Sequence, residues 1–262
     1  MKVMITGGCG QVGSHVAELM LARGDEVLAI DNFATGRPEH LVAHDNLRFV
    51  EGTIADPALV DELVSEFWPD VLIHTAASYK DPDDWYNDTL TNSVGGANLI
   101  RAARERKVGR FIYFQTALCY GVKPLHQPIR LDHPKFPANS SYAISKTTTE
   151  DYLEISGLDY VTFRLANVIG PRNVSGPLPI FFQRLSEGKR CFVTTARRDF
   201  VFVKDLARTV LKAADGMGSG AYHFSSGGDV AIKELYDAVV KAMELDEYPE
   251  PEVRDIGPDD AP

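Results

Sequence analysis

Short apolar runs alternate with longer amphipathic runs over the first two-thirds of the chain. This alternation is the pattern of repeated strand–helix units, and near-continuous apolar strands are typical of a parallel sheet with helices on both faces. The predicted fold class is therefore α/β, with a doubly wound parallel sheet. Strands are predicted at Lys2–Thr6, Glu26–Asp31, Leu47–Glu51, Asp70–Thr75, Arg110–Gln115 and Tyr160–Leu165, the last closing the series. Helices are predicted at Gln11–Arg23, Pro57–Phe67, Thr89–Lys107 and Ser140–Ser156.

The pattern of apolar and polar residues changes after Asn167. Residues Gly170–Pro179 are rich in glycine and proline, and the segments beyond them no longer follow a regular strand–helix rhythm. We therefore expect a larger domain over residues 1–167 and a smaller C-terminal substrate-binding domain over residues 168–262, with the chain crossing back into the first domain. The chain stops at Pro262 without an obvious final helix, as a truncated chain would.

Composition and net charge argue against several classes of protein but do not by themselves indicate a function. The 262 residues are 44% hydrophobic and 24% charged, as in ordinary soluble proteins, and the net charge is −10. This charge, with no lysine- or arginine-rich run, argues against nucleic acid or an anionic membrane as a partner. No stretch is typical of a membrane span or a signal peptide, so a cytoplasmic location is expected. Cys9, Cys119 and Cys191 lack zinc-site spacing, which predicts buried free thiols and no metal.

A glycine-rich turn joins the first predicted strand to the first helix. Gly7, Gly10 and Gly13 have the spacing GxxGxxG. Gly7 permits a tight turn, Gly10 lets the backbone approach a pyrophosphate, and Gly13 lets the helix lie close to the strand. The helix begins at Gln11 and Val12, where free N–H groups would face the phosphates. The triplet alone also fits a generic turn, so its meaning depends on the residues that follow.

Asp31 stands at the end of the second predicted strand. A carboxylate there can accept hydrogen bonds from an adenosine ribose and would repel a 2′-phosphate, which favours NAD over NADP. Arg37 lies nearby and could soften that preference, and the alternative for Asp31 is a solvated turn residue before Asn32. Together with the glycine turn, Asp31 predicts a Rossmann-type NAD-binding domain over residues 1–167.

Tyr142 and Lys146 lie four residues apart on the helix after the fifth strand, so they share one helix face. An adjacent ammonium and the positive nicotinamide ring of NAD both stabilise a phenolate. Tyr142 could then take the proton of a substrate hydroxyl while hydride leaves the same carbon for NAD. Such a pair is more often an ordinary surface pair, but its place after a dinucleotide motif favours catalysis.

A hydroxyl at the end of the fifth strand completes the candidate catalytic set. Thr116 could bind the substrate oxygen that becomes a carbonyl, and so assist Tyr142. The alternative is a hydroxyl that only caps the strand end.

With these motifs in place, the chain resembles an extended short-chain dehydrogenase/reductase of the NAD-dependent sugar-nucleotide epimerase/dehydratase family. It is close to the UDP-galactose 4-epimerases and especially similar to epimerase-like proteins of bacterial surface-polysaccharide gene clusters. The resemblance runs from the first strand to nearly the last residue, and it specifies the group better than the substrate. The matching segments are TGGCGQVG, DNFATG, IHTAA, the helix with Asn92, QTALCYG, YAISK, RLANVIGP and RRDFVFVKDLA.

The resemblance implies roles for further residues. Substrate contacts are implied for Thr116, Asn167 and Arg198, of which the last two would reach the nucleotide diphosphate. A homodimer through the two long helices Thr89–Lys107 and Ser140–Ser156 is usual for the family. Cofactor contacts are implied for Asn32, Thr53, Ile54, Thr75, Ala76, Ala77, Asn92, Tyr142 and Lys146.

The sequence also departs from the family pattern. Gln11 stands where an aromatic residue is usual, and Thr53 replaces an acidic adenine contact. Members usually run some tens of residues longer, and their late arginine contact to the substrate phosphate is not in register here, with Arg254 as the nearest candidate.

The two residues after Thr116 help to choose among the reactions of the family. The dehydratases place Asp-Glu there and the decarboxylases a Glu in the second slot, whereas this chain has Ala117 and Leu118, which cannot transfer protons. The resemblance therefore implies an epimerase of a UDP-sugar, acting at C4 through a 4-keto intermediate in polysaccharide or O-antigen sugar biosynthesis. Cys119 is one residue out of register with the cysteine acid of some epimerases, and packing is its expected role.

Two alternatives remain at this point. One is an NAD(P)H-dependent ketosugar-nucleotide reductase, and the other is a non-catalytic NAD-binding protein on the same fold. The sequence also leaves open whether the substrate carries UDP or dTDP, and whether its sugar is neutral, N-acetylated or a uronic acid. Lys80 and the acidic residues 81–84 flank the expected pocket, although a solvated loop is their simpler interpretation.

Overall fold

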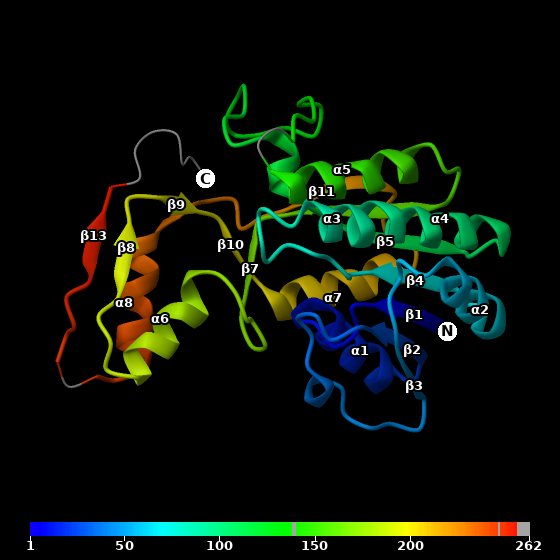
Figure 1. Cartoon of the computed structure of the whole chain (residues 1–262), viewed down its shortest axis with the longest axis horizontal. Helices are drawn as coiled ribbons and strands as arrows, with labels where there is room; N and C mark the ends of the chain where they lie inside the picture. The colour runs from blue at the N-terminus through cyan, green and yellow to red at the C-terminus, as the bar shows by residue number, and fades with distance from the viewer. Residues whose placement is uncertain (138–139, 246, 256–262) are drawn as a thin grey trace.

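A computed structural model describes residues 1–137, 140–245 and 247–255. Its main element is a seven-stranded sheet with the strand order β11-β6-β5-β4-β1-β2-β3, and each neighbouring pair is parallel (Figure 1). The part β3-β2-β1-β4-β5-β6 is the Rossmann order, which confirms the predicted fold class. The strands are β1 (Lys2–Thr6), β2 (Glu26–Asp31), β3 (Leu47–Glu51), β4 (Val71–His74), β5 (Arg110–Thr116), β6 (Tyr160–Leu165) and β11 (Gly220–Phe224).

Helices cover both faces of this sheet. On one face, Val16 and Met20 of α1 and Val210 of α7 pack against Val3 and Ile5. On the other face, a second core joins side chains of α2, α4 and α5 to those of the strands. Apolar residues are buried on both faces because every central strand is covered twice. The helices are α1 (Gln11–Arg23), α2 (Pro57–Phe67), α4 (Gly96–Glu105), α5 (Ser141–Glu154) and α7 (Val203–Ala214).

Besides shifts of one or two residues at the ends of β4, β5 and α5, the structure differs from the predicted elements in two places. The single helix expected at Thr89–Lys107 is instead a wide π-type turn, η2 (Thr89–Gly95), followed by α4. The Asn92 carbonyl in this turn accepts a hydrogen bond from the Thr149 hydroxyl of α5, and so has a partner outside its own helix. The second difference is β11, which extends the sheet beyond β6, where the pattern had ended it.

The remaining elements form a smaller unit beside the sheet (Figure 1). Phe181 and Leu185 of α6 pack against Tyr236 and Val239 of α8 to form a separate core. The pairs β7–β10 and β8–β13 are parallel, and β9–β12 is antiparallel. These elements are β7 (Asn167–Ile169), α6 (Pro177–Ser186), β8 (Phe192–Thr194), β9 (Arg197–Arg198), β10 (Phe200–Phe202), β12 (Val230–Ala231), α8 (Ile232–Ala242) and β13 (Glu252–Arg254).

The chain enters the smaller unit at β7, leaves it after β10 to form α7 and β11, and then returns. Three short helical segments complete the description: η1 (Pro38–His40), α3 (Trp85–Asp88) and η3 (Ala117–Tyr120). Within the described ranges, no helix is both long enough and apolar enough to cross a membrane.

Candidate active site

A cleft of about 1130 Å³ opens at the carboxyl ends of the parallel strands. Gly7 follows β1, Asp31 ends β2 and Thr116 ends β5, and all three line the cleft together with Arg198 of β9. Ligands of doubly wound sheets bind at this edge, where the strand order reverses. The cleft therefore brings together residues from both units of the chain.

The glycine turn forms one end of the cleft and has no room for side chains. Gly7 has a φ of +69°, and a Cβ atom on it would lie 2.7 Å from the Ala76 nitrogen. A Cβ atom on Gly13 would lie 2.2 Å from the Gly7 carbonyl oxygen, so Gly13 lets α1 approach the turn although it does not line the cleft. Gly10, Gln11 and Val12 line the cleft at the N-terminus of α1. A helix N-terminus with an uncovered backbone fits a pyrophosphate.

Asp31 is held rigidly at the end of β2. It is 7% exposed, its Oδ2 accepts a hydrogen bond from the Cys9 N–H at 2.9 Å, and its Oδ1 accepts one from the Phe33 N–H at 2.8 Å. Each carboxylate oxygen keeps a further lone pair for a ligand hydroxyl. Asn32, Thr53 and Ile54 line the same part of the cleft, which fits the adenosine end of a dinucleotide.

The wall after β4 is formed by Thr75, Ala76 and Ala77. The Thr75 hydroxyl donates to the Thr6 carbonyl at 2.7 Å and so ties this wall to the glycine turn. Asn92 lies behind the wall, where it is 1% exposed and does not line the cleft.

The Asn92 side chain contacts two neighbouring segments. Its Oδ1 accepts from the Ser78 N–H at 2.9 Å, and its Nδ2 donates to the Ser78 carbonyl at 2.8 Å and to the Ser145 hydroxyl at 3.0 Å. Asn92 thus fixes the loop after β4 against α5, and its direct contact to the cofactor stays a prediction.

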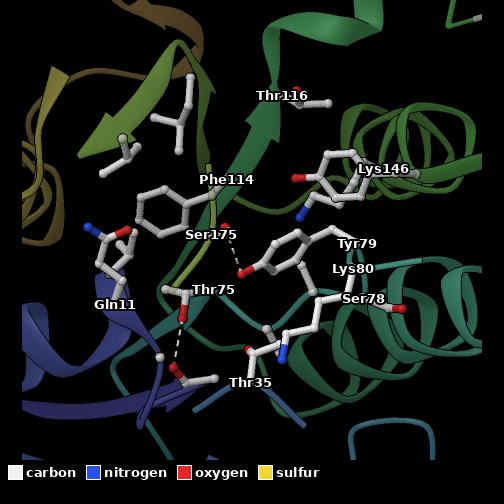
Figure 2. Close-up of a pocket in the computed structure, with 18 of the residues that line it drawn as sticks. Gln11, Thr35, Thr75, Ser78, Tyr79, Lys80, Phe114, Thr116, Lys146 and Ser175 are labelled. Carbon is white, nitrogen blue, oxygen red and sulfur yellow. Dashed lines mark hydrogen bonds between the residues drawn. The ribbon is translucent and has the colours of Figure 1, made fainter. Parts of the chain in front are cut away.

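Tyr142, Lys146 and Thr116 line the same cleft, and Figure 2 shows Thr116 and Lys146 on the side opposite Gln11. The hydroxyl of Ser140 caps α5 by accepting from the Ala143 N–H at 3.2 Å, so the helix begins just before Tyr142. Lys146 is 2% exposed. The fold therefore brings the three predicted catalytic side chains to one cavity.

The protein environment shifts the pKa values of Tyr142 and Lys146 in opposite directions. Burial raises the pKa of Tyr142, and the nearby Tyr79 and Asp88 add to the rise. Burial lowers the pKa of Lys146 to about 7, against an opposing effect of Glu150. The described residues alone therefore favour the neutral phenol, and further positive charge beside Tyr142 would be needed to stabilise a phenolate.

The two predicted substrate-diphosphate contacts lie in the smaller unit. Asn167 of β7 donates to the Asp199 carbonyl at 3.0 Å, and Arg198 donates to the Arg197 carbonyl at 2.9 Å. Both line the cleft. Arg254 does not line it and instead pairs with Glu252 at 2.8 Å, while the chain end GPDDAP lies outside the described residues.

Three residues at or beside the cleft had no firm assignment from the sequence. Tyr79 lies edge to face with Tyr142 at 6.2 Å between ring centroids, and its hydroxyl accepts from the Ser175 hydroxyl at 3.4 Å (Figure 2). Lys80 lines the cleft, and its Nζ lies 3.5 Å from the Ala34 carbonyl oxygen. Tyr79 and Lys80 follow the predicted wall with only Ser78 between, and this closeness in the sequence was the available signal.

The third such residue is Asp88, which is 1% exposed. Neither of its carboxylate oxygens has a hydrogen-bond partner among the described residues. Nothing in the sequence pattern pointed to it. Cys9, Cys119 and Cys191 are buried and free, as predicted, and burial raises the pKa of the Cys9 and Cys119 thiols to about 12.

The strand order and the glycine turn define a dinucleotide-binding α/β protein. The profile of the NAD dependent epimerase/dehydratase family matches residues 3–223. A UDP-glucose 4-epimerase of Mycolicibacterium smegmatis is 31% identical over 95% of this chain and 85% of its own length. The Bordetella bronchiseptica enzyme WbmH, solved with NAD+, is 75% identical with a TM-score of 0.97, covering 100% of this chain and 87% of that one. WbmG of the same organism, solved with NAD and UDP, is 41% identical with a TM-score of 0.91, over 99% and 82%.

The chain belongs to the NAD-dependent epimerase/dehydratase family. The expected resemblance to sugar-nucleotide epimerases is confirmed, as are the expectations of an enzyme and of NAD as its cofactor.

Proposed function

We propose that the chain inverts C4 of a UDP-sugar through a 4-keto intermediate, with Tyr142, Lys146 and Thr116 as the reacting set. The observation that carries the proposal is the convergence of these three side chains on the cleft that also contains the glycine turn and Asp31. The name of the Mycolicibacterium smegmatis relative and the UDP in the WbmG structure support a UDP-sugar. A role in surface-polysaccharide or O-antigen sugar synthesis is supported by the resemblance of the sequence.

In this mechanism each side chain acts on one atom of the substrate or on its neighbour. Bound NAD would accept hydride from C4 and later return it. Tyr142, as phenolate, takes the proton of the C4 hydroxyl, and Lys146 as ammonium stabilises that phenolate. Thr116 donates a hydrogen bond to the same oxygen as it becomes a carbonyl. Tyr142 returns its proton after the keto sugar has turned its other face.

The diphosphate of the substrate would be the pivot of this turn. Arg198 and Asn167 line the cleft in the smaller unit, where a guanidinium and an amide suit phosphate oxygens. Such placed donors are required because the protein is acidic, with a net charge of −10.

The residues beside Thr116 favour a redox cycle without elimination. Ala117 and Leu118 line the cleft, and neither side chain can transfer a proton. A dehydratase would need an acid and a base beside the sugar to expel a hydroxyl as water. Epimerisation needs only the groups already named.

A homodimer through α4 and α5 is part of the proposal. Tyr86 of α3, Ile144 and Tyr152 of α5, and Ile155 directly after α5 expose 74%, 51%, 48% and 80% of their surface, which is typical of an apolar interface. Sedimentation of the purified chain should give twice the mass of one chain, and Ile155→Glu should yield monomers. A wild-type monomer at all concentrations would contradict the dimer. The cytoplasmic location and the domain division at residues 167–168 stay predictions.

The experiment that tests the function uses a panel of UDP- and dTDP-sugars. Purified protein is incubated with each, and the C4 configuration is read by NMR while NADH absorbance is followed. We expect a mixture of two C4 epimers from at least one UDP-sugar, with no net change in NADH. In a parallel reaction with a ketosugar nucleotide and added NADH, stoichiometric NADH oxidation coupled to reduction of the ketone would indicate a ketosugar reductase instead. NAD binding without conversion of any sugar would indicate a non-catalytic protein.

A further inference from the structure

A buried carboxylate lies one helical turn beyond Lys146. Glu150 of α5 is fully buried, and its Oε1 accepts from the Arg164 Nε of β6 at 2.9 Å. Its Oε2 accepts from the Gln115 Nε2 of β5 at 3.1 Å and lies 3.8 Å from the Lys135 Nζ. Burying a carboxylate is costly unless it is paired, so this position is unusual for a residue with only a packing role.

One of these contacts leads directly to Thr116. Gln115 is 1% exposed, and its Oε1 accepts from the Thr116 backbone N–H at 2.8 Å. Because Glu150 can only accept from the Gln115 amide, it fixes which end of that amide faces Thr116. The Thr116 backbone at the end of β5 is thereby held in one orientation at the cleft, where the Thr116 hydroxyl accepts from the Leu118 N–H at 3.2 Å.

The second connection leads to Lys146 through charge. No ion pair reaches the Lys146 ammonium within residues 1–137, 140–245 and 247–255, and it lies 4.3 Å from the centroid of the Tyr113 ring. Glu150 opposes the loss of the Lys146 proton that burial favours. Lys146 in turn disfavours a charge on His74 of β4, which is fully buried.

Other charged and titratable groups face Glu150 from each packed element. Arg164 extends from β6 and also donates to the Tyr120 hydroxyl of η3. Lys135 approaches from the loop before α5, where it also pairs with Asp151 and Glu154. The Cys119 thiol of η3 is buried nearby, and its pKa is raised partly by Glu150.

We propose that Glu150 is a positioning residue, which orients Thr116 through Gln115 and whose negative charge keeps Lys146 protonated. Neither role brings it into contact with a ligand, since it does not line the cleft. The inference rests on the proposed function, in which Lys146 acts as a cation and Thr116 as a hydrogen-bond donor.

The test compares Glu150→Gln with Glu154→Gln in the full chain. Glu154 lies one turn further along α5, contacts Lys135 and Arg164 as well, and its side chain is 40% exposed. Loss of the Glu150 charge should move the alkaline limb of the kcat profile, where Lys146 loses its proton, down by about one pH unit. Glu154→Gln should keep the wild-type limb. A Glu150→Gln limb that coincides with the wild-type limb would overturn the inference.

Gln115→Met tests the hydrogen-bonded connection from Glu150 through Gln115 to Thr116. It should lower kcat by about tenfold or more through a displaced Thr116, with the alkaline limb unmoved and NAD binding kept. Wild-type kcat in this variant would refute the path through Gln115. If Glu150→Gln fails to fold because Arg164 loses its partner, the double variant Glu150→Gln/Arg164→Met removes both buried charges and carries the same prediction for the limb.

A measurement without turnover separates this inference from the proposed function. In cofactor-free protein, the unfolding free energies of wild type and of Glu150→Gln are each compared with that of the same protein carrying Lys146→Met. The part of the difference that is due to the Lys146 charge disappears once Lys146 is neutral in both the folded and the unfolded state. As the pH rises, this free-energy difference begins to fall at the pKa that Lys146 has in the folded protein. The fall should begin about one pH unit lower in Glu150→Gln than in wild type. An unchanged pH of onset would overturn the inference even if no sugar is epimerised.

Discussion

Lys146 and Tyr113 contact each other at two points, one through the Lys146 side chain and one through its backbone. The Lys146 ammonium lies 4.3 Å from the centroid of the Tyr113 ring, and the Tyr113 hydroxyl donates to the Lys146 carbonyl at 2.9 Å. An ammonium over an aromatic face is attracted to it. Even so, burial lowers the pKa of Lys146 to about 7 from its usual 10.5. Lys146 is therefore held in place at a cost in stability, as is common for groups that serve a reaction.

The lowered pKa of Lys146 predicts how the stability of cofactor-free protein depends on pH. Between about pH 7 and 10.5 the unfolded chain binds the Lys146 proton and the folded chain does not, so stability from this group rises with pH. The variant Lys146→Met should therefore be more stable than wild type near pH 7. The gap should shrink by up to about 1.4 kcal/mol per pH unit as the pH rises. Urea unfolding at several pH values measures it, and a gap independent of pH would refute the lowered pKa.

Gly13 gives a prediction about the cofactor turn. A Cβ atom there would lie 2.2 Å from the Gly7 carbonyl oxygen, so Gly13→Ala must displace either α1 or the turn. We expect a loss of about 1–3 kcal/mol in unfolding free energy and a weaker affinity for NAD. Gly228→Ala is the matched control, because a Cβ atom on Gly228 meets nothing within 4 Å. Calorimetric titration with NAD measures the affinity, and equal NAD affinities in both variants would contradict the close approach.

Asp31 gives a prediction about cofactor choice. The carboxylate at the end of β2 would repel a 2′-phosphate, so Asp31→Asn should lower the preference for NAD over NADP by about tenfold. NAD binding itself should weaken as well, since the amide can accept from only one of the Cys9 and Phe33 N–H groups. The two dissociation constants are measured by titration, with the exposed Asp45→Asn as control. A ratio that stays at the wild-type value would exclude Asp31 as the selecting group.

Most of the fold was predictable because its signals are local. Buried parallel strands are continuous apolar runs, and the bounds of β1, β2, β3 and β6 agree with the predicted ones. The wide turn η2 was not predictable, because it depends on the hydroxyl of Thr149, which lies far along the chain. The strand β11 was missed for a similar reason, since its place in the sheet depends on α7 returning to pack on α1.

The candidate site, like the fold, was predictable from the sequence only in part. The glycine turn, Asp31 and the pair Tyr142 and Lys146 follow from spacing along one or two elements, and the structure places all of them at one cleft apart from Gly13, which lies behind it. The contact of Tyr79 with Ser175 and the burial of Glu150 depend on residues brought together from distant segments. No periodicity marks such contacts, so they require coordinates.

The central claim is that Tyr142 moves the proton of the reacting hydroxyl, and Tyr142→Phe tests it most directly. This change removes one oxygen from the cleft and should leave NAD binding within about threefold of wild type. Tyr222→Phe is the control, because Tyr222 lies in β11 and its hydroxyl accepts only from the Ser219 N–H among the described residues. The measurement is the rate of C4 inversion by NMR on a UDP-sugar that the wild type converts. The account predicts a loss of about a hundredfold or more in Tyr142→Phe and none in Tyr222→Phe, whereas wild-type turnover in Tyr142→Phe would contradict it.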